Sequence, residues 1–178
     1  MGEDKVEVEL YTDRLRLRNL RETDKPDFIR LHLDESVNRL VRDIEPLAVI
    51  EEKFNQRHLP WYYESGLWLT LVIETLDGRF VGYTGFHCED GVSKRAEVGY
   101  LLAPEAQGQG FATEATQAVI DWGRHVYGIH KFIAWCAADN LGSRRVLEKC
   151  GFQQEGLLKQ HTLIGGQWHD DCIYGLLA

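Results

Sequence analysis

The sequence predicts an α/β fold, in which helices pack on a mixed sheet, and three observations support this prediction. Polar and apolar residues alternate over Arg14–Leu20, as in a half-buried strand. The glycine-rich segment Gln107–Gly110 separates a β-rich stretch from a long amphipathic helix. The run Phe132–Ala138 is apolar on both faces, which is typical of a central strand covered on both sides. The length of 178 residues fits one domain, residues 1–178.

Local signals place the other elements between these three. In chain order we expect a helix opening at Thr23-Asp24, an irregular helix over Leu47–Tyr63 that breaks at Pro60, strands over Leu67–Thr75, Phe80–Cys88 and Ala96–Ala103, the long helix, the strand Phe132–Ala138, a short helix from Asn140 to Gly151, and two strands within Gln154–Leu177. Asp77-Gly78 and Gly165-Gly166 supply the tight turns of two hairpins. This order of strands and helices predicts a mixed sheet.

The long helix begins after the glycines and has one apolar face. Its apolar positions at helical spacing are Phe111, Ala115, Ala118, Val119, Trp122 and Val126. We expect this face to pack on the sheet.

Composition narrows the class of protein. The formal net charge of −8 repels phosphates, so nucleic acid is not an expected partner. No apolar run is long enough to cross a bilayer, and the polar, acidic start Met1–Glu9 is not a signal peptide, so we expect a cytoplasmic protein without a membrane segment. The acidity would attract cationic acceptors such as amines, or serve solubility alone.

The four cysteines, Cys88, Cys136, Cys150 and Cys172, form no C-x-x-C pair and lie near no histidine at zinc spacing. We expect free thiols in a reducing compartment, no metal site, and core packing for Cys136 and Cys150.

The segment Gln107–Ala112 lies between a strand and a helix. Glycines let backbone N–H groups approach a ligand, and the helix start adds unpaired N–H groups and a positive dipole end, so the segment can hold a pyrophosphate. The alternative is a simple turn. No Lys-Ser/Thr follows the glycines, and the loop follows the fourth predicted strand instead of the first, which argues against a P-loop and a dinucleotide fold.

The same segment matches the Q/R-x-x-G-x-G/A signature of the GNAT superfamily of N-acetyltransferases, and the chain resembles its RimJ/RimL-like ribosomal-protein branch from about Tyr11 to Leu177. The motifs that carry the resemblance are Thr12–Arg18, Glu97–Tyr100, Asn140–Ser143, Lys149–Phe152, Glu155-Gly156, Gly166, Asp170 and Tyr174. The resemblance implies a GNAT fold, whose mostly antiparallel sheet splays between the fourth and fifth strands.

The resemblance also implies acetyl-CoA as co-substrate. Amides of Gln109, Gly110, Phe111, Ala112 and Thr113, in the loop that starts with Gln107 and Gly108, would hold the pyrophosphate. The strand ending at Leu101-Leu102-Ala103 would part from Phe132–Ala138 and bind the pantetheine arm like an added strand. Asn140 would reach the pantetheine, with Ser143 and Arg144 near the cofactor on one helical face; an N-cap and a solvated helix side are the plainer interpretations.

One position departs from the family pattern. Many members carry a Tyr seven residues after this Asn as general acid, whereas this chain has Leu147. In the ribosomal-protein branch a serine has been proposed for that role, and Ser143 occupies its position. The absent Tyr leaves open a non-catalytic acetyl-CoA-binding module.

Amine acetylation needs a proton acceptor, since an amine is mostly charged at pH 7. Glu97 and Glu155 are the two candidates for the base, each with a structural salt bridge as the alternative. Trp61, Tyr62, Tyr63 and Trp68 are interpreted as core packing, or as a wall of the acceptor groove.

The acceptor that the resemblance favours is the α-amino group of a protein or peptide N-terminus, such as that of a ribosomal protein. Such a group has a pKa about two units below that of lysine, so more of it is neutral at pH 7. Polyamines and aminoglycosides are the alternatives, and a nucleotide-binding module would instead bind ATP or NAD. Whether the chain forms a homodimer stays open.

Overall fold

One mixed sheet of eight strands forms the centre of the computed structural model, which describes residues 5–178; Met1–Asp4 of the acidic start lie outside the described residues. The strand order is β1-β2-β3-β4-β5-β6-β8-β7, and every neighbouring pair is antiparallel except β5–β6. The strands are β1 (Glu9–Tyr11), β2 (Leu15–Asn19), β3 (Leu71–Thr75), β4 (Phe80–Asp90), β5 (Arg95–Leu102), β6 (Lys131–Ala137), β7 (Gln153–Ile164) and β8 (Gln167–Leu177). The predicted α/β class with a mostly antiparallel mixed sheet is confirmed.

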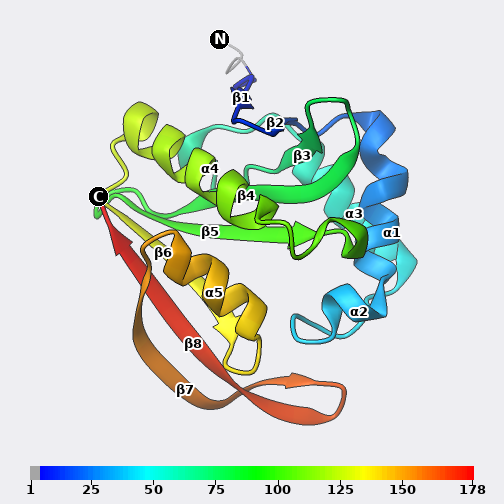
Figure 1. The fold of residues 1–178 in the computed structure, drawn as a ribbon, viewed down its shortest axis with the longest axis vertical. Coiled ribbons are helices and arrows are strands. Elements are labelled where there is room, and N and C mark those ends of the chain that lie inside the picture. The colour runs from blue at the N-terminus through cyan, green and yellow to red at the C-terminus, as the bar shows by residue number, and fades with distance from the viewer. Residues whose placement is uncertain (1–4) are drawn as a thin grey trace.

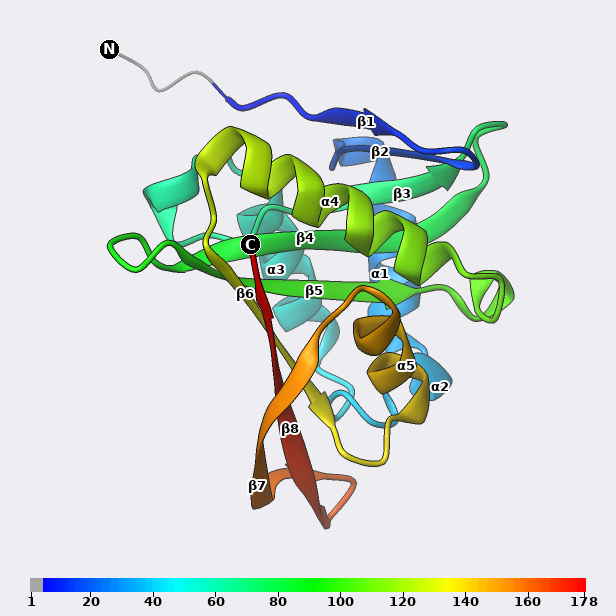
Figure 2. The ribbon, with the colours of Figure 1, turned by 60° about the vertical axis from the view of Figure 1, so that its left-hand side comes forward.

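Helices cover both faces of this sheet. Helices α4 (Phe111–Tyr127) and α5 (Leu141–Lys149) lie on one face, and α1 (Lys25–Leu33), α2 (Glu35–Asn38) and α3 (Leu47–His58) lie on the other (Figures 1 and 2). The β7–β8 hairpin extends beyond the helical layers (Figure 2). Each face of the sheet therefore buries apolar side chains against its own helical layer.

The parallel pair β5–β6 parts after three residues. Arg95, Ala96 and Glu97 pair with Lys131, Phe132 and Ile133, and β5 then continues to Leu102 while bonded only to β4. Figure 2 shows the two strands crossing near one end and diverging toward α5. The expected splay between the fourth and fifth predicted strands is confirmed, because the added strand β1 makes them β5 and β6 here.

Helix α4 packs closely on the sheet through Gly123, where a Cβ would lie 3.0 Å from Phe86 Cε1 and 3.0 Å from Ile129 Cδ1. The buried residues are Phe111, Ala115, Thr116, Val119, Ile120 and Gly123. Val126 was expected on this face, but it is 50% exposed. The prediction for Val126 is wrong because the buried stripe ends with Gly123 and the helix itself ends at Tyr127.

Two short elements and one late strand start depart from the predictions. The three-residue β1 and the four-residue α2 carry too little periodicity to be read from sequence, and α2 depends on Asp34, whose side chain accepts the Val37 N–H at 3.0 Å. The strand expected from Leu67 begins only at Leu71. Before it, the chain runs beside β4, where the Leu69 N–H donates to the Phe86 carbonyl at 2.9 Å, and a Cβ at Gly85 would lie 1.8 Å from the Leu69 carbonyl oxygen.

The predicted helix caps and hairpin turns agree with the structure. The Asn140 side chain accepts the Ser143 N–H at 3.1 Å and begins α5, and Gly151 follows the helix with φ of +92°. Gly165 and Gly166, with φ of +59° and +73°, join β7 to β8. From Phe132 to Ala137, strand β6 is buried as expected except at Trp135, which is 42% exposed.

Candidate active site

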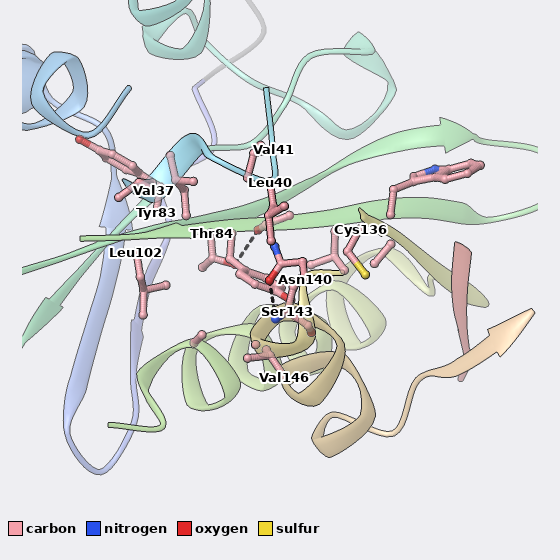
Figure 3. A pocket seen from close by; sticks show the side chains of 18 of the residues that line it. Val37, Leu40, Val41, Tyr83, Thr84, Leu102, Cys136, Asn140, Ser143 and Val146 are labelled. Carbon is pink, nitrogen blue, oxygen red and sulfur yellow. Dashed lines mark hydrogen bonds between the residues drawn. The ribbon is translucent and has the colours of Figure 1, made fainter. Parts of the chain in front are cut away.

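A groove of about 1050 Å³ follows the gap between β5 and β6. It runs from the start of α4, past α5, to the α1–α2 region and the β7–β8 hairpin. In Figure 3, Val37, Leu40 and Val41 approach it from one side and Asn140, Ser143 and Val146 from the other. Residues predicted from the sequence that line it are Glu97, Leu101, Leu102, Gln107, Gly108, Gly110, Phe111, Ala112, Thr113, Asn140 and Ser143.

The glycine loop at one end of the groove presents backbone instead of side chains. Gly108 and Gly110 have φ of +74° and +81°, a conformation that glycine adopts without strain. Gly110 is the residue from which α4 starts, so the N–H groups of Phe111, Ala112 and Thr113 lie in its first turn, where no preceding helical carbonyl is available. These amides and the helix dipole favour an anion.

Arg14, the residue immediately before β2, holds this loop in place. Its Nη1 donates to the Gln109 carbonyl at 2.9 Å, its Nη2 lies 2.7 Å from Glu114 Oε2, and its guanidinium carbon lies 4.5 Å from the Phe111 ring centroid. The loop conformation is therefore tied both to α4 and to the first strands of the sheet.

The middle of the groove is lined by unpaired strand backbone. Beyond Glu97, β5 has no strand on its β6 side up to Leu102. Backbone groups there can accept an extended ligand as a strand would. Because side chains alternate along β5, Glu97, Gly99 and Leu101 face one side of the sheet, and Tyr100 and Leu102 face the other.

A pair of hydroxyl groups lies on the α5 side of the gap. Tyr100 Oη is 2.7 Å from Ser143 Oγ, and it also donates to the Ser143 carbonyl at 3.1 Å. Burial raises the pKa of Tyr100, so its hydroxyl stays protonated. Leu147, at the position of the family tyrosine, is 1% exposed and contributes only packing. Tyr100 ends the Glu97–Tyr100 motif, but nothing in the sequence alone marks it as part of the site.

A carboxylate and an imidazole lie on the opposite side. Glu97 Oε2 is 3.0 Å from His87 Nε2, and this hydrogen bond is the largest of the effects that raise the pKa of His87. Trp68 covers the pair, with its ring centroid 4.5 Å from that of His87 and its ring edge 3.3 Å from where a Cβ of Gly99 would lie. His87 was not among the predicted residues, because only the antiparallel register of β4 and β5 places it opposite Glu97.

Four predicted residues do not line the groove. Glu155 forms a 2.6 Å ion pair with Lys131. Arg144 points toward β8 and β7, where it donates to Tyr174 Oη at 3.0 Å and to Gln154 Oε1 at 3.3 Å. The remaining two are Ala103, which is fully buried, and Gln109, whose backbone carbonyl bonds to Arg14.

Charged residues in the groove lining were largely missed from the sequence. The cationic members are Arg39, Arg42, Arg57, Arg145 and Lys149, and the carboxylates are Glu97 and Asp171. Arg145 and Lys149 share a face of α5 at i, i+4 spacing, which is the one signal that could have indicated them. The groove is thus locally cationic in a chain of net charge −8.

The four aromatic residues of the segment 61–68 were interpreted as core packing or as a groove wall, and the structure shows both. Trp61 and Tyr63 are buried in the core, as expected, whereas Trp68 lines the groove. Tyr62 is mostly at the surface. Core packing is therefore confirmed for two of the four residues.

All four cysteines are free thiols, and Cys136 and Cys150 are buried as predicted. Burial raises the pKa of each of these two thiols to about 11. No three His, Cys, Asp or Glu side chains of residues 5–178 come together in a way that could hold a metal ion. Among the helices described here, none is both long and apolar enough to cross a membrane.

Comparison with known proteins agrees with this geometry. A family model described as an acetyltransferase (GNAT) domain matches residues 14–153. An uncharacterized N-acetyltransferase of Bacillus subtilis, YoaA, is 31% identical over 94% of this chain and 96% of its own. Ribosomal-protein-serine acetyltransferase of Escherichia coli is 32% identical over 55% of each chain. The crystal structure of spermidine N-acetyltransferase from Vibrio cholerae, in complex with CoA and spermine, has a TM-score of 0.82 at 23% identity and covers 93% of this chain and 96% of that one.

Proposed function

The chain belongs to the GNAT acetyltransferase family, and from this premise we propose that it moves the acetyl group of acetyl-CoA onto the α-amino group of a protein or peptide N-terminus. It is an N-acetyltransferase that acts on amines. The identity of the amine, the roles of the individual residues and the treatment of residues 1–178 as one domain are parts of the proposal.

The observation that carries the proposal is the parting of β5 and β6 after Glu97 and Ile133. It opens unpaired backbone along Val98–Leu102 for the pantetheine arm of acetyl-CoA, in line with the anion-binding start of α4. The thioester would then lie near Glu97, between the carboxylate on one face of the sheet and the Tyr100–Ser143 hydroxyl pair on the other.

The groups on these two faces suit a direct attack of the acceptor amine on the acetyl carbon of the thioester. Glu97 Oε2 is engaged by His87, and Oε1 has no hydrogen-bond partner among the described residues, so Oε1 is free to take the proton of the amine, directly or through water. The amine nitrogen bonds to the acetyl carbon, and a backbone N–H of β5 stabilises the oxyanion. As the carbon–sulfur bond breaks, the departing thiolate accepts a hydrogen bond from the Ser143 hydroxyl, which Tyr100 helps to position, and the proton taken up by Glu97 passes to the thiolate or to water.

The charges of the groove favour a peptide N-terminus over a polyamine. We call the part of the groove away from the glycine loop, near α2 and α3, the acceptor end. Arg39, Arg42 and Arg57 line it, and they would repel a second or third ammonium group of spermidine or an aminoglycoside. An α-amino group adds a single charge and is partly neutral at pH 7. The relative named ribosomal-protein-serine acetyltransferase is consistent with this acceptor class.

A competition assay tests the proposal. The purified chain is given acetyl-CoA with an equimolar mixture of N-terminal peptides, spermidine and an aminoglycoside, and the products are resolved by mass spectrometry. We expect the acetyl group on the peptide α-amine. Preferential acetylation of spermidine or the aminoglycoside would refute the acceptor class, and binding of acetyl-CoA without transfer to any amine would support the non-catalytic alternative.

A further inference from the structure

We propose that Arg57, assisted by Arg42, binds an acidic side chain close to the N-terminus of the acceptor peptide. The inference rests on the proposed function, because it concerns the acceptor end of the same groove. It adds a substrate class, acidic N-terminal sequences, and a specificity-determining residue outside the acetyl-transfer chemistry.

Arg57 is a guanidinium without an ionic partner. It lies in the last turn of α3 and lines the groove, and no carboxylate of residues 5–178 lies within 4.0 Å of it. Its one side-chain hydrogen bond is long, 3.5 Å from Nη1 to Thr70 Oγ1. The guanidinium carbon is 5.1 Å from the Trp68 ring centroid, so one face of the group is held against the groove wall.

The surroundings of Arg57 make its charge costly. Burial, followed by repulsion from Arg42, lowers the pKa of Arg57 to about 10. A guanidinium that is partly withdrawn from water, as the half-buried Arg57 is, is normally compensated by a carboxylate. Arg18 shows this usual arrangement in the same protein, since it is bonded to Asp24 at 2.8 and 2.9 Å and lies 3.3 Å from Glu74.

The nearby carboxylates form no ion pair with Arg57. Glu97 lowers the cost of the Arg57 charge from a distance, but its Oε2 accepts the hydrogen bond of His87. Glu45 is shared between Lys53 and Arg42, the latter at 3.9 Å. Arg57 and Arg42 therefore keep capacity for a further anion at the acceptor end.

A carboxylate on the acceptor matches this site. Arg57 can offer two parallel N–H groups to a carboxylate, and Arg42 adds a second positive charge. Since Glu97 and Trp68 line the same end of the groove, a peptide that seats its acidic residue on Arg57 can place its amine beside Glu97. A stacking role on Trp68 alone would leave no dependence on the charge of the acceptor.

The test uses three peptides with an N-terminal serine and an amidated C-terminus, which differ only in carrying glutamate, glutamine or lysine at the two following positions. The wild-type protein should show a kcat/KM for the glutamate peptide at least about tenfold above that for the glutamine peptide. R57Q should reduce this ratio to about twofold or less by slowing the glutamate peptide alone. A glutamine peptide with a free C-terminal carboxylate distinguishes a side-chain carboxylate from a terminal one.

Arg79→Gln is the matched control, because the Arg79 side chain is exposed in the β3–β4 turn and forms its ion pair with Asp77, outside the groove. It should leave the peptide preference unchanged, and acetyl-CoA affinity should be the same in both variants. Equal kcat/KM for the glutamate and glutamine peptides in the wild-type protein would overturn the inference, as would a glutamate preference that persists in folded R57Q. The wild-type comparison needs no variant, so a failure of R57Q to fold leaves the inference refutable. Failure of the proposed function is recognised separately, by the absence of transfer to all three peptides.

Discussion

Glu97 and His87 face each other across β4 and β5, and Glu97 is also the last residue of β5 that pairs with β6. The hydrogen bond of 3.0 Å between Glu97 Oε2 and His87 Nε2 therefore lies at the point where the sheet opens. The hydrogen bond holds Glu97 Oε2 in place and leaves Oε1 free for the proton transfer that we propose.

The two carboxylates suggested by the sequence can be separated by one experiment. Glu97→Gln keeps the size of the side chain but removes the proton acceptor, so kcat/KM for the peptide should fall by about a hundredfold or more. Glu155→Gln is the matched change outside the groove, in the ion pair with Lys131, and should keep a rate near that of the parent. Steady-state kinetics with acetyl-CoA affinity as a control measures both; a loss confined to Glu155→Gln would reverse the assignment.

The pKa of His87 should depend on Glu97. The hydrogen bond to Glu97 raises the pKa of His87 above 6.5, and NMR titration of the ring protons in Glu97→Gln should give a lower value. A raised folded-state pKa stabilises the protein below the unfolded value, and this stabilisation is lost as pH rises through the folded value. The difference in unfolding free energy between parent and Glu97→Gln should therefore be largest near pH 6, shrinking toward pH 9 to its pH-independent part. An unchanged His87 titration would contradict the pairing.

Removal of the Ser143 hydroxyl tests departure of the thiolate. Ser143→Ala should lower kcat by about tenfold, because a hydrogen bond that strengthens as the thiolate forms contributes roughly 1–3 kcal/mol. Tyr100→Phe should give a smaller loss, since Tyr100 acts through Ser143 at 2.7 Å. The measurement is kcat with a parallel dissociation constant for acetyl-CoA. A Ser143→Ala rate within about twofold of the parent, at unchanged affinity, removes Ser143 from the mechanism.

Alanine substitutions at two glycines with similar backbone conformations can distinguish a loss of acetyl-CoA binding from the effect of backbone strain. Gly110 and Gly78 have φ of +81° and +88°, so alanine at either position is strained. Gly110→Ala also adds a methyl group 3.4 Å from Arg14 Nη2 in the loop that we propose to hold the pyrophosphate, and calorimetry should show weaker acetyl-CoA binding. Gly78→Ala should lower thermal stability without changing that affinity. Equal affinity in the two folded variants would count against the loop assignment.

Local signals in the chain were enough to predict most of the elements. The alternation at Arg14–Leu20, the cap at Asn140, the glycine after α5 and the Gly165-Gly166 turn each depend on residues within a few positions of one another. Such short-range preferences are carried by backbone conformation and by side chains that bond to nearby amides. The glycine loop before α4 belongs to the same class of signal.

The assembly of the site depended on contacts between distant segments. The side chains of Glu155 and Arg144 bind Lys131 and Tyr174 instead of lining the groove, and the β4–β5 register places His87 opposite Glu97. Arg57, in the last turn of α3, lines the groove, although nothing around it in the sequence marks it. The sequence alone therefore determined the elements and the family to which they belong, whereas strand pairing and helix packing in three dimensions decided which charged and hydroxyl groups meet in the groove, since those contacts join residues far apart in the chain.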